Sequence, residues 1–203
     1  MTDLLLDALP TRWAGRRIDP DFRHMVWLAN AYVRREPEAE PLRFAREAVA
    51  RFYTAPEDLL ADPARMADAY RHLLEFYLGN DAATPEKSSG SASVGAGPAY
   101  DYHCDAPYIV AAFQQAYGID LTCEQVHWWR FRALLRSLPE DCLFCRILHW
   151  RTADLTDMPP EQRRFYEDKR QIFALPPELK GGAARAVSVA EHEAAFLARF
   201  RQR

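Results

Sequence analysis

Apolar residues recur every three or four positions along most of this 203-residue chain, a spacing that is typical of amphipathic α-helices. One stretch has well-defined ends, because Asp62 and Pro63 are favoured at a helix start and Gly79 at a helix end. A short hairpin is predicted around Gly15, within residues 12–18. The pattern therefore predicts a mainly α-helical, multi-helix fold with a short N-terminal β-hairpin. Helices are expected at about residues 20–35, 41–53, 63–78, 139–150 and 160–174.

A further helix is predicted to follow Asp105. A carboxylate at this N-cap position can accept hydrogen bonds from the free N–H groups of the first turn. Gly118 lies where a left-handed residue ends a helix, and Ile119 can then fold back on the apolar face. That apolar face consists of Ile109, Ala112, Phe113 and Ala116.

The next helix is predicted to start at about Cys123. Thr122 and Gln125 have the spacing of a capping box, and Leu121 and Val126 have that of a hydrophobic staple. This helix is apolar around most of its circumference, which places it in the core. Its two apolar stripes are Trp128, Phe131, Leu135 and Leu138, and Val126, Trp129 and Ala133.

Two segments are expected to lie outside the core. Residues 80–99 are small and polar, a composition typical of a mobile linker. Residues 177–203 include a short amphipathic stretch, with Ser188 and Glu191 at capping-box spacing. This tail is expected to be solvated or self-packed, with docking on a partner as the alternative. The predicted organisation is one helical domain over residues 1–176, interrupted by the linker, and a tail over residues 177–203.

Composition and charge narrow the class of protein. Hydrophobic residues make up 49% of the chain and aromatic residues 12%, which indicates a globular domain. The net charge of −3 gives no positive surface of the kind that binds nucleic acid or an anionic membrane. The first residues lack the basic start of a secretory signal, and no apolar run reaches the roughly 18–20 residues of a membrane-spanning helix. We therefore expect a cytoplasmic protein that binds neither nucleic acid nor membrane.

Cys142, Cys145 and His149 lie on one face of a predicted helix and are candidates for a metal or redox site. Along a helix, however, Cys142 and His149 are separated by about 10 Å, too far for easy sharing of one tetrahedral zinc ion. A redox motif needs its first cysteine at a helix N-terminus beside a βαβ sheet, and no such strands are predicted. We interpret the cysteines as reduced core residues and expect no metal or cofactor. Candidates for a fourth ligand are Cys104, Cys123, His103 and His127.

His127 has helix-face spacing to Cys123 and Glu124, but a catalytic pair also needs an orienting third group and an oxyanion hole. The sequence shows neither, so we interpret His127 as an edge or core-capping residue. The two tryptophans after it are interpreted as core residues. No phosphate-binding loop or catalytic signature was found, which argues against an enzyme. The arginines interpreted as a solvated flank of this helix are Arg130, Arg132 and Arg136.

A specific order of residues runs from Tyr100 to Arg151 and includes the segment His127-Trp128-Trp129. This order resembles the bacteriophage gp-fifteen family of siphophages and prophages, and the resemblance extends over about residues 3–176. Cys142 to Cys145 depart from the family pattern, so a site at these cysteines would be peculiar to this chain. Ten residues, here called the signature residues, are assigned by the resemblance to core or partner contacts: Asp105, Tyr117, Gly118, Ile119, Asp120, His127, Trp128, Trp129, Phe131 and Arg151.

The resemblance implies a role through gene position. Family members are encoded between the tail tube protein and the tape-measure protein, where long-tailed phages place tail assembly chaperones. The resemblance therefore implies a non-enzymatic chaperone in the host bacterial cytoplasm that binds the tape-measure protein and other tail proteins. It implies no particular oligomeric state. One alternative is a structural tail or connector component that stays in the virion, and a less favoured one is a Cys/His zinc protein or enzyme.

Overall fold

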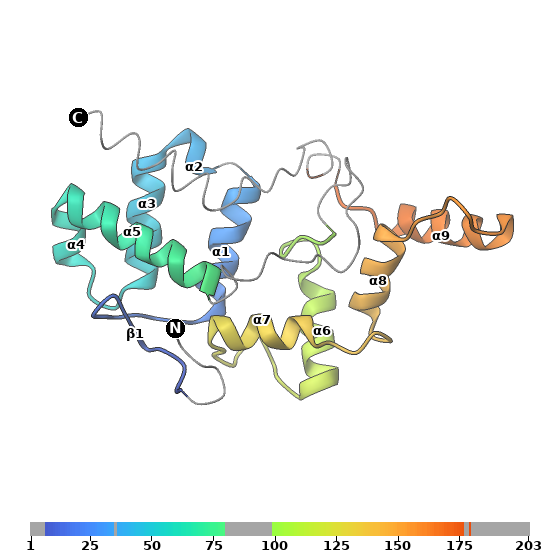
Figure 1. Cartoon of the computed structure of the whole chain (residues 1–203), viewed down its shortest axis with the longest axis horizontal. Coiled ribbons are helices and arrows are strands. Elements are labelled where there is room, and N and C mark those ends of the chain that lie inside the picture. The colour runs from blue at the N-terminus through green and yellow to red at the C-terminus, as the bar shows by residue number, and fades with distance from the viewer. Residues whose placement is uncertain (1–6, 35, 80–98, 177–178, 180–203) are drawn as a thin grey trace. The chain divides into compact units, whose positions relative to one another are not determined.

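A computed structural model describes residues 7–34, 36–79, 99–176 and 179, and most of them lie in helices (Figure 1). The predicted mainly α-helical fold with an N-terminal hairpin is confirmed. The described chain falls into two compact units. The first holds the hairpin, helices α1 to α5 and the start of α7, and the second holds α6, the end of α7, α8 and α9. The elements are β1 (Arg12–Trp13), β2 (Arg16–Arg17), α1 (Phe22–Val33), α2 (Glu36–Ala39), α3 (Pro41–Phe52), α4 (Glu57–Ala61), α5 (Pro63–Leu78), α6 (Ala106–Tyr117), α7 (Trp128–Arg136), α8 (Leu143–Thr152) and α9 (Pro160–Ile172).

The predicted hairpin consists of strands β1 and β2, which pair antiparallel with Trp13 opposite Arg16. The turn residues Ala14 and Gly15 both have positive φ, at 47° and 78°, as a tight turn between twisted strands requires. Trp13 packs edge-on against Phe76, with ring centroids 5.6 Å apart. This contact anchors a hairpin that would be only marginally stable alone.

Helices α3 and α5 lie side by side in the first unit and bury one face each (Figure 1). Helix α1 joins them through Trp27, which stacks on Phe44 with ring centroids 5.2 Å apart. The hydroxyl groups of Tyr32 and Tyr70 also hydrogen-bond to each other. The buried residues of α3 are Phe44, Ala45, Ala48, Val49 and Phe52. Those of α5 are Met66, Ala67, Ala69, Tyr70, Leu73, Leu74 and Phe76.

Helix α5 has the ends that its sequence predicts. Asp62 accepts hydrogen bonds from the backbone N–H groups of Ala64 and Arg65, at 2.8 and 3.2 Å. Pro63 occupies the first helical position, and Gly79 ends the helix with a φ of 63°. The predicted range of 63–78 is the observed one, because every signal that defines it is local.

The two short helices α2 and α4 were not predicted. They have four and five residues, too few to show helical periodicity. Helix α4 is positioned by contacts with distant residues, since the guanidinium group of Arg16 donates two hydrogen bonds to Asp58, at 3.0 and 2.6 Å. Leu59 on the same helix is buried. Such contacts leave no periodic pattern in the local sequence.

Helix α7 begins at Trp128, so the predicted start at about Cys123 is wrong. The residues around the helix start bond to the backbone of a distant segment instead. The Val126 carbonyl accepts a hydrogen bond from the Phe22 N–H group at 2.9 Å, and the Pro20 carbonyl accepts one from the Trp128 N–H group at 2.8 Å. These bonds to the start of α1 take the place of helical bonds. The capping-box and staple interpretations of residues 121–126 are also wrong, because residues 120–124 form a separate turn in which the Asp120 carbonyl accepts the N–H groups of Cys123 and Glu124, at 3.2 and 2.8 Å.

The predicted burial of α7 is confirmed at the start of the helix and wrong near its end. Trp128, Trp129 and Phe131 are buried, as predicted for a core helix. Ala133 is exposed and Leu135 is only half-buried, so the apolar coverage of the helix is narrower than its sequence indicates.

Helix α8 begins at Leu143 with Cys142 as its N-cap, so the predicted start at Pro139 is wrong. The Pro139 carbonyl instead accepts a hydrogen bond from the Cys142 N–H group at 3.1 Å, which closes a turn before the helix. Ile147 and Trp150 are buried as predicted, whereas Leu143 is exposed.

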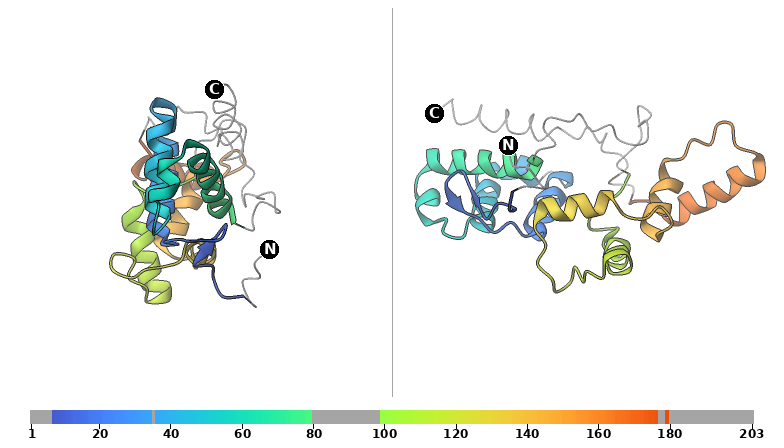
Figure 2. Two further views of the ribbon diagram at one scale, coloured as in Figure 1. Left: turned by 90° about the vertical axis from the view of Figure 1, so that its left-hand side faces the viewer. Right: turned by 60° about the horizontal axis from the view of Figure 1, so that its bottom comes forward.

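Helix α9 begins at Pro160 as predicted, and Figure 2 shows it connected to α8 by an extended loop within the second unit. The predicted linker at residues 80–99 lies outside the described residues except for residue 99, and the predicted tail at 177–203 does so except for residue 179. In the part of the chain that the structure describes, no helix is long and apolar enough to cross a membrane.

Candidate functional site

The two tryptophans of α7 cap the C-terminal end of α5. Their indole N–H groups donate to main-chain carbonyls, Trp128 to Tyr77 at 2.8 Å and Trp129 to Phe76 at 2.9 Å. Each indole also stacks on the side chain of the residue whose carbonyl it binds. The last turn of a helix leaves carbonyl groups without intrahelical partners, and these indoles satisfy two of them in a buried position. The tryptophan pair therefore fixes the start of α7 on α5.

Arg132 belongs to the same cap, so its interpretation as part of a solvated flank is wrong. Its Nη1 atom donates to the carbonyls of Tyr77 and Leu78, at 3.1 and 2.8 Å. A cation is favoured at this position because the C-terminal end of a helix is electrically negative. Arg130 and Arg136 are exposed, as expected of a flank.

Gly79 lets the chain pass close to this cap. Its φ of 63° and ψ of −154° are accessible essentially to glycine only, and an added Cβ would lie 3.0 Å from Nε1 of Trp129. We expect Gly79→Ala to lower the free energy of unfolding by about 1–3 kcal/mol, as measured by urea denaturation. Gly118→Ala is the control, because Gly118 also has positive φ but a Cβ there meets nothing within 4 Å. A loss no larger at Gly79 than at Gly118 would contradict the importance of the indole contact.

His127 acts as a cap for α7. Its Nδ1 atom accepts a hydrogen bond from the Trp129 N–H group at 3.1 Å, and its Nε2 atom lies 3.2 Å from the Pro10 carbonyl. These bonds fit the neutral imidazole, with the proton on Nε2. Burial lowers the pKa of His127, which also favours the neutral form. Both ring nitrogens have structural partners, as expected of a core-capping residue.

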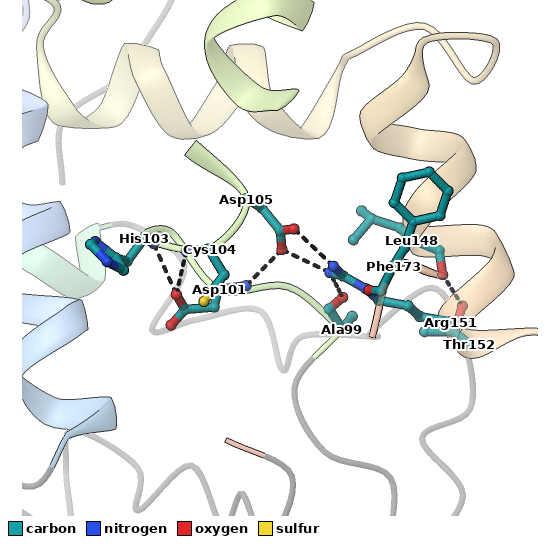
Figure 3. A network of polar contacts seen from close by, with 9 residues as sticks. All are labelled: Ala99, Asp101, His103, Cys104, Asp105, Leu148, Arg151, Thr152 and Phe173. Carbon is teal, nitrogen blue, oxygen red and sulfur yellow. Dashed lines mark hydrogen bonds and ion pairs between the residues drawn. The ribbon is translucent and has the colours of Figure 1, made fainter. Parts of the chain in front are cut away.

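Arg151 and Asp105 form a buried ion pair within the second unit (Figure 3). Two parallel hydrogen bonds of 2.7 and 2.8 Å join the guanidinium group to the carboxylate, whose side chain is only 1% exposed. Arg151 also donates to the carbonyls of Ala99 and Phe173, at 3.1 and 2.7 Å. One side chain thereby joins α8 to the segment before α6 and to the residue after α9.

The role of a side-chain N-cap predicted for Asp105 is wrong, because its carboxylate belongs to this ion pair. It occupies the N-cap position of α6, but its side chain makes no capping hydrogen bond there. The carboxylate instead accepts the Asp101 N–H group at 3.0 Å in addition to the bonds from Arg151. Asp101 caps the preceding turn, since its Oδ1 atom accepts the N–H groups of His103 and Cys104 at 2.9 and 2.8 Å. A carboxylate that is paired with a buried cation makes stronger hydrogen bonds there than at a neutral cap.

Four signature residues lie at the end of α6 and in the connection after it. Gly118 has a left-handed conformation, with φ of 67° and ψ of 12°, as predicted. Tyr117 donates its hydroxyl to the Leu134 carbonyl at 2.9 Å, and Ile119 is buried. Asp120 accepts the Thr122 N–H group at 2.8 Å, and this bonding to Thr122 lowers the pKa of the Asp120 carboxyl.

The Cys/His set does not converge. His149 pairs with the Tyr166 hydroxyl at 2.9 Å, while Cys142 and Cys145 lie in the first turn of α8. Cys104 is half-buried and Cys123 is exposed. Among the described residues, no group of three or more His, Cys, Asp or Glu side chains is arranged to hold a metal ion.

Helix α9 presents a surface that the sequence interpretation missed. None of its 13 residues is buried, and Phe165 and Ile172 are 47% and 68% exposed. Glu161 and Asp168 precede these two residues by four positions each, which puts the carboxylates beside the apolar side chains on one helix face. Neither carboxylate has an ion-pair partner among the described residues. We call these four side chains the α9 surface.

Helix α9 packs against α8, and Phe165 takes part through an edge-on contact with Trp150, with ring centroids 6.4 Å apart. Trp150 stacks on Phe173 with ring centroids 5.4 Å apart, and the Lys169 ammonium lies 5.4 Å from the Trp150 ring. Arg170 donates to the carbonyls of Trp150 and Ala153, at 3.2 and 2.6 Å. The helix therefore has a fixed position, while large parts of Phe165 and Ile172 stay exposed. In the sequence this stripe looks like any core-facing stripe, because periodicity does not report whether another element covers it.

Comparison with known proteins adds one match. A protein-family model described as Bacteriophage Gp15 protein matches residues 46–175. This range is more than half of the chain and includes all ten signature residues and the α9 surface. No curated protein and no solved structure matches the chain.

Proposed function

Because this chain belongs to the Bacteriophage Gp15 family, we propose that it is a non-enzymatic tail assembly chaperone that binds the tape-measure protein. The family is one of phage structural or assembly proteins, which interact with other phage proteins. In this proposal the chain acts in the host bacterial cytoplasm, covers helical segments of the tape-measure protein and releases them to the growing tail tube. The engagement of both His127 ring nitrogens in structural bonds supports a role without catalysis.

The observation that carries the proposal is the α9 surface. A helix of 13 residues is marginally stable in water unless a packed face supports it. Here α8 covers one side of the helix and contacts the edge of Phe165, and the exposed parts of Phe165 and Ile172 remain available for a partner. An exposed apolar stripe bordered by polar groups is typical of a binding site for another protein.

The shape and charge of the α9 surface favour an amphipathic helix as its occupant. Phe165 and Ile172 are seven positions apart and so lie on the same face, the spacing by which helices pack along one another. Glu161 and Asp168 lie beside this stripe, and the Lys169 ammonium lies 5.5 Å from the Phe165 ring, so the border carries charges of both signs. We propose that the two carboxylates pair with Lys or Arg residues beside the apolar stripe of the occupant. A basic-bordered amphipathic helix of the tape-measure protein is the occupant that we propose.

The test is a pull-down of the tape-measure protein with the double variant Phe165→Ser/Ile172→Ser. Removal of two central apolar contacts is expected to weaken binding by about tenfold or more. The matched control is Val33→Ser/Leu42→Ser, which removes two apolar side chains that are 47% and 49% exposed in the first unit. The control should bind as the unchanged chain does, and both variants should keep their far-ultraviolet circular dichroism spectra.

A charge variant tests the choice of occupant. Glu161→Lys/Asp168→Lys should also weaken binding, and the loss should shrink as salt concentration rises, because exposed charges are screened. If the apolar variant binds normally while the unchanged chain captures the tape-measure protein, then the α9 surface is not the contact. If the unchanged chain captures nothing, the chaperone proposal itself is contradicted.

A further inference from the structure

The two cysteines at the start of α8 lie in contact with each other. Cys142 is the N-cap of the helix and its sulfur accepts a hydrogen bond from the Cys145 N–H group at 3.5 Å. The Cys145 thiol donates to the Leu138 carbonyl at 3.9 Å. Residues three apart in a helical turn have Cα atoms about 5 Å apart, inside the range that a disulfide spans.

The position of Cys142 removes one objection raised by the sequence. We expected a redox Cys-x-x-Cys motif to need its first cysteine at a helix N-terminus, and Cys142 occupies that position because α8 begins later than predicted. A βαβ sheet is still missing from the described residues, so a thioredoxin-like fold is not implied.

We infer that Cys142 and Cys145 form a reversible intramolecular disulfide, with a low-molecular-weight disulfide as the oxidant. Cys145 is the more accessible of the two, since Cys142 is buried. The Cys145 thiolate attacks one sulfur of the small disulfide and forms a mixed disulfide, releasing one small thiolate. The Cys142 thiolate then attacks the Cys145 sulfur and releases the second small thiolate. Two protein thiols lose two protons and two electrons, and one small disulfide becomes two small thiols.

The surroundings of Cys145 set the pH dependence of this exchange. Burial, and then the neighbouring Cys142 thiol, raise the pKa of the Cys145 thiol to about 12. Only the thiolate attacks, so disulfide formation should be slow at neutral pH. Its rate should rise by about tenfold per pH unit between roughly pH 7 and 9, where the thiolate fraction rises by that factor.

The test uses the full, reduced chain incubated with oxidised glutathione. In the variant Cys104→Ser/Cys123→Ser, which removes the two other cysteines, the remaining two thiols should both become unreactive toward a thiol reagent. Intact mass should fall by two hydrogen atoms, with no glutathione retained, and dithiothreitol should restore both thiols. Peptide mapping should place the link between Cys142 and Cys145.

Single substitutions separate the two steps. Adding Cys142→Ser to that background should trap glutathione on Cys145, because the resolving thiol is gone. Adding Cys145→Ser should leave the buried Cys142 reduced. The inference would be overturned if both thiols stayed reduced in the background variant, if glutathione stayed on Cys145 with Cys142 present, or if the link joined two chains. Circular dichroism before oxidation checks that each variant is folded.

Discussion

Replacing Arg151 with alanine is expected to lower the free energy of unfolding by about 3–5 kcal/mol. The change leaves the Asp105 carboxylate, 1% exposed, without its cation in a buried position. It also removes the donors to the carbonyls of Ala99 and Phe173. Urea denaturation followed by circular dichroism measures the loss. We expect the loss to be concentrated in the second unit, where all of these groups lie.

Two controls separate the effect of the unpaired buried carboxylate from the effect of removing any arginine side chain. Arg164→Ala removes an exposed arginine of α9 and is expected to change stability by no more than about 0.5 kcal/mol. Adding Asp105→Asn to Arg151→Ala should recover part of the lost stability, because an amide is less costly than an unpaired carboxylate in a buried site. A double variant no more stable than Arg151→Ala would contradict the electrostatic explanation.

Trp128→Ala is expected to lower the free energy of unfolding by about 3–5 kcal/mol, the usual range for removal of a buried tryptophan. The side chain is 1% exposed and stacks on Tyr77 and Phe131. Trp128→Phe keeps most of the apolar contact but leaves the Tyr77 carbonyl with one donor fewer, and should have a smaller effect of about 1–3 kcal/mol. Chemical denaturation of the two variants gives both values.

The matched control for the cap is Trp27→Phe. Trp27 is only partly buried and stacks on Phe44, a contact that phenylalanine can largely reproduce. Trp27→Phe should lower the free energy of unfolding by less than Trp128→Phe does. Equal losses of stability at the two positions would mean that the hydrogen bond from the Trp128 indole to the end of α5 contributes little to stability.

The sequence predicts elements well where their signals are local. The range of α5 follows from Asp62, Pro63 and Gly79, each of which acts within its own turn. The end of α6 at Gly118 and the hairpin turn at Gly15 follow from glycine conformation in the same way. These predictions need no knowledge of the rest of the chain.

Predictions fail where distant groups compete for the same backbone or side chain. The start of α7 is delayed because Pro20 and Phe22 bond to the residues before Trp128. Asp105 has the right position for a cap, but Arg151, 46 residues later, takes its carboxylate. Both outcomes depend on tertiary partners, which a local sequence pattern does not reveal.

For the candidate site too, the sequence identified some of the important residues and missed others. The resemblance to a phage family singles out the signature residues, and the structure describes what several of them do: His127 and the tryptophans cap helix ends, and Arg151 joins three segments. The α9 surface was missed, because only coordinates distinguish an exposed apolar stripe from a buried one. The residues most specific in sequence are therefore architectural here, and we place partner binding elsewhere.

The central claim is that the chain binds the tape-measure protein transiently during tail assembly. The most direct test is to capture the tape-measure protein with this chain from cells that express both, and to search mature particles for the chain by mass spectrometry. The account predicts capture, higher soluble yield of the tape-measure protein, and absence from the particle. No capture with no change in yield would contradict binding, and abundance in the particle would instead identify a structural tail component.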